Sequence, residues 1–153
     1  MAGRLQGRIA LVTGASRGIG AAVARRFAAE GAQVVLVART VAGLEEVDDA
    51  IRAASAGDVQ ATLVPIDLHN GDDIDKLAQA IAERFGRLDI LVGNAAILGE
   101  MTPVSQIEPD SWADVVSINL TANWRLVRGL ESLLLASEAG RAMFVTSGVS
   151  GGR

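Results

Sequence analysis

Three glycines, Gly14, Gly18 and Gly20, stand between a short apolar segment at 9–12 and a segment with helical periodicity. Glycine in such a turn lets the backbone approach a bound group closely, and it leaves room for the helix to pack on the strand. The amino end of the helix then attracts an anion. The spacing indicates a turn that binds the pyrophosphate of a dinucleotide, although a tight strand-to-helix turn without a ligand would use the same residues.

A second candidate lies just after the apolar segment 34–37, where the chain carries Arg39. In a dinucleotide-binding fold an acidic residue near this point bonds the ribose hydroxyls of NAD, whereas an arginine pairs with the additional 2′-phosphate of NADP. Residues 36–40 hold no acid, and Arg17 adds a second positive charge from within the glycine turn. The two arginines therefore favour NADP over NAD, with two solvated surface side chains as the alternative.

Polar and small residues follow two further apolar segments. Asp67 and Leu68 come after one of them, and the sequence Gly-Asn-Ala-Ala at 93–96 comes after the other. Ligands bind at the carboxyl ends of strands in open parallel sheets, so both groups stand where a cofactor would lie. The small residues would let a ring or a ribose approach the backbone, whereas Asn94 would bond either the cofactor or a neighbouring strand.

The elements that must position these residues alternate along the chain. Short continuous apolar runs, typical of strands buried on both faces of a parallel sheet, predict five strands at 9–12, 34–37, 61–64, 90–92 and 143–145. Helical periodicity predicts helices at 21–30, 41–54, 72–85 and about 108–135. Strand–helix–strand alternation predicts an α/β fold with a doubly wound parallel sheet, and residues 1–153 are expected to form a single domain.

Composition excludes several classes of function. The chain has 153 residues, no cysteine and a single histidine, His69. This composition excludes disulfides, thiolate metal sites, a histidine-based metal site and a Ser-His-Asp triad inside the chain. We expect no metal site, and we expect His69 to be a surface loop residue. The net charge of −4 argues against a nucleic-acid partner. No apolar run could span a bilayer and no apolar signal region opens the chain, so we expect a cytoplasmic protein without a membrane partner.

Taken together, the motifs resemble those of the short-chain dehydrogenase/reductase family. They comprise residues 13–20, Asp67, residues 93–96, Asn119 and residues 144–147, and the resemblance covers nearly the whole chain. It implies a Rossmann fold and an NADP(H)-dependent oxidoreductase that moves hydride between the nicotinamide and a small-molecule carbonyl or secondary alcohol. It also implies a homodimer or homotetramer that forms through the long helix at about 108–135.

The resemblance assigns roles to individual residues of the cofactor site. It implies that the pyrophosphate is held by Gly14, Ser16, Arg17, Gly18 and Ile19, the 2′-phosphate by Arg39, the adenine by Asp67 and Leu68, and the nicotinamide-side ribose by Asn94, beside Ala95 and Ala96. Gly93 and Ala96 depart from the family's Asn-Asn-Ala-Gly, but both keep the segment small.

Catalysis in the family depends on an Asn-Ser-Tyr-Lys tetrad, in which the asparagine anchors a water of the proton relay. Asn119 matches the asparagine, and either Ser147 or Ser150 would supply the serine, with Ser147 preferred. The chain contains no tyrosine, so the family's Tyr-x-x-x-Lys segment is expected after Arg153. We therefore expect the chain to be the cofactor-binding part of a fold whose C-terminal part is missing. The alternatives are an NADP(H)-binding pseudoenzyme or regulator and a non-catalytic fragment.

Overall fold

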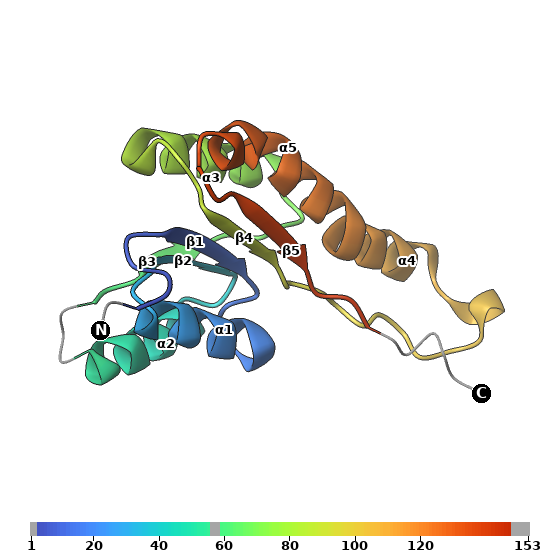
Figure 1. The fold of residues 1–153 in the computed structure, drawn as a ribbon. Helices are drawn as coiled ribbons and strands as arrows, with labels where there is room; N and C mark the ends of the chain where they lie inside the picture. Colours follow the sequence, from blue (N-terminus) through green and yellow to red (C-terminus); the bar gives the residue numbers. More distant parts are fainter. Residues whose placement is uncertain (1–2, 56–58, 148–153) are drawn as a thin grey trace.

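The computed structural model describes residues 3–55 and 59–147, which fold around a parallel sheet (Figure 1). Its strands are β1 (Ile9–Thr13), β2 (Gln33–Ala38), β3 (Thr62–Pro65), β4 (Ile90–Gly93) and β5 (Arg141–Phe144). They lie in the order β3-β2-β1-β4-β5, and every neighbouring pair is parallel. The chain builds outward from β1 to β3 and then crosses back to β4 on the other side of β1. The predicted doubly wound α/β fold is confirmed.

Helices cover both faces of the sheet. On one face lie α1 (Gly18–Ala29) and α2 (Val41–Ala54), and on the other lie α3 (Gly71–Phe85) and α5 (Ala122–Leu135) (Figure 1). Helix α3 is capped at its start by the Asn70 side chain, which accepts a bond from the Asp72 N–H, and it ends at Gly86 in the left-handed conformation. The remaining helices are α4 (Pro109–Val116) and the short 3₁₀ helix η1 (Val104–Gln106).

Two hydrophobic layers enclose the sheet because successive strand residues point to opposite faces. Ala10 and Val12 pack towards α1 and α2, whereas Leu11, between them, packs towards α3 and α5. All three side chains are fully buried. Burial on both sides explains why the strand reads as a continuous apolar run rather than an alternating one.

The segment predicted as one helix at 108–135 has the expected extent but an irregular centre. Helices α4 and α5 are joined without a break by a π turn, η2 (Ser117–Thr121), in which the N–H of Ala122 bonds the carbonyl of Ser117 five residues back. Such a turn inserts one residue into the helix and opens its backbone locally. The predicted catalytic residue Asn119 lies at the centre of this turn.

Several predicted bounds are wrong by one to three residues. Strand β5 lies at 141–144 rather than 143–145, because its pairing with β4 begins at Arg141, a residue that apolar patterning does not select. Strand β3 lies at 62–65 rather than 61–64, and Pro65 is tolerated because β3 is an edge strand. Helix α1 begins at Gly18, not at 21, because the glycines of the turn take part in its first turn.

A buried carboxylate, Asp89, links the segments at the amino ends of the central strands β1 and β4. Oδ2 of Asp89 accepts bonds from the Ile9 N–H at 2.8 Å and from Arg87 Nε at 3.3 Å, and Oδ1 accepts from Arg8 Nη1 at 3.0 Å and the Ser137 hydroxyl at 2.6 Å. Burial raises the pKa of Asp89, but these donors outweigh it and hold the pKa below its usual range. Asp89 thus joins β1, β4 and the turn that precedes β5.

Within the described ranges, no helix is long and apolar enough to cross a membrane. The same residues contain no group of three or more histidine or acidic side chains that could hold a metal ion.

Candidate cofactor-binding site

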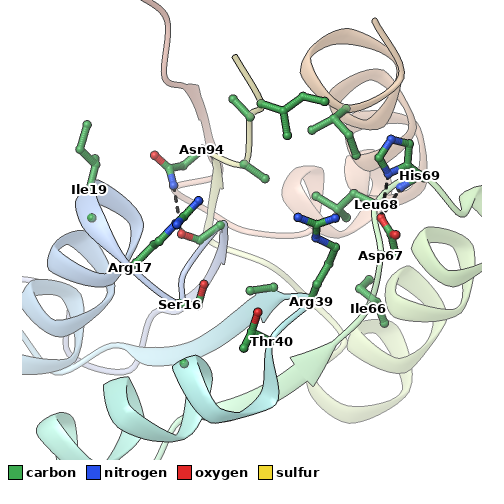
Figure 2. Close-up of a pocket in the computed structure, with 18 residues that line it drawn as sticks. Ser16, Arg17, Ile19, Arg39, Thr40, Ile66, Asp67, Leu68, His69 and Asn94 are labelled. Carbon is green, nitrogen blue, oxygen red and sulfur yellow. Dashed lines mark hydrogen bonds and ion pairs between the residues drawn. The ribbon is translucent and has the colours of Figure 1, made fainter. Parts of the chain in front are cut away.

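The residues predicted to bind a cofactor line one cavity of about 610 Å³ at the carboxyl ends of the strands (Figure 2). All eleven are there: Gly14, Ser16, Arg17, Gly18, Ile19, Arg39, Asp67, Leu68, Asn94, Ala95 and Ala96. The cavity spans the carboxyl ends of β1 to β4 and includes the point between β1 and β4 where the order of the strands reverses, which is the usual ligand position in an open α/β sheet. Its volume is within the range of small-molecule sites.

The three glycines of the turn are required for three different reasons. Gly14 has φ +62° and lies so close to Asn94 that a Cβ would come within 2.9 Å of its Nδ2. Gly18 has φ +56° and faces open space at the cavity. Gly20 packs against the turn itself, and a Cβ there would overlap the carbonyl oxygen of Gly14. The turn therefore combines positive φ angles with two close backbone approaches that only glycine permits.

The start of α1 faces the cavity and suits a negatively charged group. Arg17 is the N-cap residue, its backbone is extended, and no side chain caps the first N–H groups of the helix. The first turn also carries no acidic residue. Unpaired N–H groups and the positive end of the helix dipole make this a favourable position for phosphate oxygens.

Thr13 joins the glycine turn to the segment after β4, a role that the sequence analysis missed. Its hydroxyl donates to the carbonyl of Val92 at 3.3 Å and accepts from the N–H groups of Asn94 at 2.9 Å and Ala95 at 3.0 Å. Thr13 is fully buried. A polar residue that ends an apolar run was the available signal, because a buried hydroxyl must find partners.

Asn94 strengthens the same junction. Its Nδ2 donates to the carbonyls of Thr13 at 3.0 Å and Gly14 at 3.3 Å. Of the two alternatives that the sequence left open, the bond to a neighbouring strand is what the structure contains. The amide oxygen is not used in these bonds and keeps its capacity to accept.

The two predicted arginines flank the cavity from different elements (Figure 2). Arg17 extends from the glycine turn beside Ser16, and Arg39 extends from the end of β2 towards Asp67 and Leu68. Gly43 of α2 also lines the cavity, and a Cβ there would come within 2.9 Å of the Ser16 Cβ. The glycine turn and the start of α2 are therefore held close together beneath the arginines.

Asp67 is held in its charged form at the far end of the cavity. The N–H of His69 donates to Asp67 Oδ1 at 3.0 Å, and Nδ1 of the same residue lies 3.0 Å from that oxygen. The His69 N–H lowers the pKa of Asp67, burial opposes this, and the His69 ring and Arg39 add to the lowering. His69 is exposed on a loop as expected, and its Nε2 also lies 3.5 Å from Asp114 Oδ1 of α4.

Asn119, predicted as catalytic, is bonded to the backbone of Ile97, a residue of the cavity wall. Its Oδ1 accepts from the Ile97 N–H and its Nδ2 donates to the Ile97 carbonyl, both at 2.9 Å. Ile97 lines the cavity wall that continues from Asn94. Both ends of the Asn119 amide are therefore occupied by one backbone unit of that wall.

The predicted serine lies apart from this arrangement. Ser147 follows β5, is exposed, and is not among the described residues that line the cavity. Ser150, the alternative, lies outside the described residues. The cavity wall also includes Thr40, Ile66 and Ile97, for which the sequence carried no signal beyond their position after strand ends, and Ile118 of the π turn, for which it carried none.

Comparison with known proteins agrees with this geometry. A family model for short chain dehydrogenases matches residues 8–152. The chain belongs to the short chain dehydrogenase family. It is 37% identical over 145 residues to the uncharacterized oxidoreductase YciK of Escherichia coli K12, covering 95% of this chain and 58% of that protein. It is 39% identical over 153 residues to a 3beta-hydroxysteroid dehydrogenase of Mediterraneibacter gnavus, covering 99% of this chain and 53% of that protein.

A solved member of the family shares the fold closely. A short chain dehydrogenase of Shigella flexneri 2a str. 301, complexed with NADP, superposes with a TM-score of 0.92 at 37% identity. The match covers 100% of this chain and 64% of that one. The chain spans little more than half the length of the two curated relatives named above.

Proposed function

We propose that this chain is the cofactor-binding part of an NADP(H)-dependent oxidoreductase acting on a small-molecule carbonyl or secondary alcohol. One observation carries the proposal: the uncapped start of α1, with its three glycines, opens into the same cavity as Arg39. A helix start suits a pyrophosphate, and a guanidinium at the end of the second strand suits a 2′-phosphate. Bound NADP(H) would supply the hydride donor or acceptor.

The residues of the chain divide the binding among them. The N–H groups at the start of α1, with Ser16 and Arg17, would hold the pyrophosphate, and Arg39 the 2′-phosphate. Asp67 and Leu68 would receive the adenine, because a charged carboxylate accepts a bond from an amino group. Asn94, beside Ala95 and Ala96, would bind the nicotinamide-side ribose. A relative solved with NADP supports this choice of cofactor.

In the family, proton transfer depends on a tyrosine and a lysine that follow the serine, and residues 1–153 contain no tyrosine. Asn119 would contribute by fixing the cavity wall at Ile97, and Ser147 by orienting a substrate oxygen. The second candidate is a protein that binds NADP(H) without turnover. A carbonyl-reductase assay on the full-length protein separates the candidates, since only the oxidoreductase would oxidise NADPH when carbonyl substrates are added.

Binding of the cofactor tests the proposal directly. Calorimetric titrations with NADPH and with NADH are expected to show at least tenfold tighter binding of NADPH. The reason is that each hydrogen bond between Arg39 and the charged 2′-phosphate would contribute about 1.5–3 kcal/mol. Equal affinities would contradict the assignment of Arg39. Binding of neither cofactor would overturn the proposed function.

We also propose that two copies of the protein associate through α4 and α5. Trp112, Leu120 and Trp124 are 62%, 67% and 55% exposed on this continuous helix, and large exposed apolar groups often mark interfaces. The full-length protein is expected to sediment as a dimer or tetramer. The double variant Trp112→Glu/Trp124→Glu is expected to sediment as a monomer, whereas Met101→Glu, at an even more exposed apolar position on a loop, should not change the assembly. A monomeric wild-type protein would refute this mode of assembly.

A further inference from the structure

In the π turn, a side chain from the next turn of the helix donates a hydrogen bond to a backbone carbonyl. The turn shifts the backbone bonding register by one residue, as the bond from the Ala122 N–H to the Ser117 carbonyl shows. Within it, the main-chain carbonyl of Asn119 accepts a hydrogen bond from Nδ2 of Asn123 at 2.9 Å. The side chain one turn later therefore bonds a carbonyl of the irregular segment.

The end of β4 leaves the room that Asn123 needs. Gly93 is buried, and a Cβ at this position would lie 2.6 Å from Oδ1 of Asn123 and would overlap the ring of Phe144 on β5. Gly93 directly precedes Asn94. The half-buried amide of Asn123 thus lies against the strand end from which the cavity wall begins.

The wall at 94–97 is fastened at two points. At its start, the Thr13 hydroxyl binds the N–H groups of Asn94 and Ala95. At its end, the Asn119 amide binds both backbone groups of Ile97. The bonds at the start of the wall are made by Thr13, which is fully buried. The bonds at its end are made by Asn119, an exposed residue of the π turn, so they depend on the conformation of that turn.

We propose that Asn123 is a positioning residue for the cofactor: it holds the π turn in the conformation from which Asn119 fixes Ile97 and the 94–97 wall. The inference rests on the proposed function for the identity of the ligand, because the nicotinamide-side ribose is assigned to this wall. Asn123 is not among the described residues that line the cavity. It acts through Asn119 and Ile97.

A matched pair of variants isolates the hydrogen bond. Asn123→Ser keeps a donor, because a helical serine can bond the carbonyl four residues back, whereas Asn123→Ala removes it. Alanine is the better helix former, so loss of helix stability cannot explain a defect that only the alanine variant shows. In the full-length protein, Asn123→Ala is expected to weaken NADPH binding about three- to tenfold, and Asn123→Ser less than about twofold.

A second ligand distinguishes positioning from general damage. Adenosine 2′,5′-bisphosphate carries the adenine and the 2′-phosphate but no nicotinamide, so its affinity should be the same for both variants and the wild type. Equal losses for both ligands in Asn123→Ala, equal losses in the serine and alanine variants, or no loss in either would each overturn the inference.

Hydrogen exchange provides a readout that needs no cofactor. The Ile97 amide, bonded to Asn119 Oδ1, is expected to exchange at least about three times faster in Asn123→Ala than in the wild type or Asn123→Ser. Unchanged exchange would overturn the role of Asn123. If the wild type bound neither NADPH nor the bisphosphate, the proposed function would fail while this measurement still decided whether Asn123 holds the wall.

Discussion

Replacement of Asp89 by alanine is expected to lower the free energy of unfolding by about 3 kcal/mol. The Asp89 side chain is 1% exposed and accepts four hydrogen bonds. Its loss would leave the Ile9 N–H without its bond in the interior and would release the Ser137 hydroxyl. Arg8 and Arg87 are 37% and 44% exposed and can regain water, which limits the cost.

Denaturant unfolding followed by circular dichroism would measure this effect. Asp49→Ala is the matched control, because Asp49 is exposed on α2 and its replacement should change stability by less than about 0.5 kcal/mol. If the two variants were equally stable, the Asp89 carboxylate would not be fastening the sheet.

The effect of Asp89 should also depend on pH. Because the pKa of Asp89 is lower in the folded protein than its usual value of about 3.9, the charged carboxylate stabilises the fold fully above about pH 4, and this contribution is lost as the pH falls through the folded pKa. The stability difference between the wild type and Asp89→Asn should therefore be largest near neutral pH and shrink below pH 4. A difference that is constant from pH 7 to pH 3 would contradict the sign.

Replacement of Arg39 by aspartate is expected to weaken NADPH binding about 100-fold while changing NADH binding less than about threefold. The guanidinium would pair with the 2′-phosphate, and a carboxylate in its place would repel it. NADH lacks this phosphate, and an acid at the end of the second strand can bond its ribose hydroxyls instead. The preference between the cofactors should therefore reverse.

The comparison requires a control for net charge. Arg25→Asp makes the same change in charge at an exposed position on α1 and should leave both affinities within about twofold at physiological salt. Calorimetric titration of the wild type and both variants with each cofactor decides the matter. A loss of NADPH affinity in Arg25→Asp as large as that in Arg39→Asp would show that overall charge is responsible.

The fold could be predicted from the sequence where burial is strong on both sides. Strands β1 and β4 are covered by two helical layers, so their apolar runs were unambiguous. Strand β5 was displaced by two residues at its start because its register depends on pairing with β4, which no local pattern reveals. All four residues of β5 are exposed, and such an edge strand carries a weak local signal.

The irregular centre of the long helix could not be predicted. Asn119 and Asn123 are ordinary polar residues on a helix until the backbone of Ile97 and the space beside Gly93 are brought next to them. These partners are distant in sequence, so propensity and periodicity give a continuous helix. The departure of Gly93 from the family motif was visible, but its consequence for Asn123 was not.

The candidate site was predictable as a set because parallel strands bring their carboxyl ends to one edge. All eleven proposed cofactor residues follow β1, β2, β3 or β4, and topology alone gathers them. What each residue contacts was not predictable. The amide nitrogen of Asn94 donates to carbonyls of the glycine turn, and the ring of His69 lies beside the carboxylate of Asp114 on α4.

The buried hydroxyl of Thr13 has a consequence for how a ligand enters and leaves. One oxygen atom joins the last residue of β1 to β4 and to both amides that begin the opposite wall. We therefore expect the glycine turn and the start of the opposite wall to move together at the floor of the cavity. If the proposed cofactor binds in this cavity, we expect the motion that admits it to come from the loops around the cavity and not from the Thr13 junction.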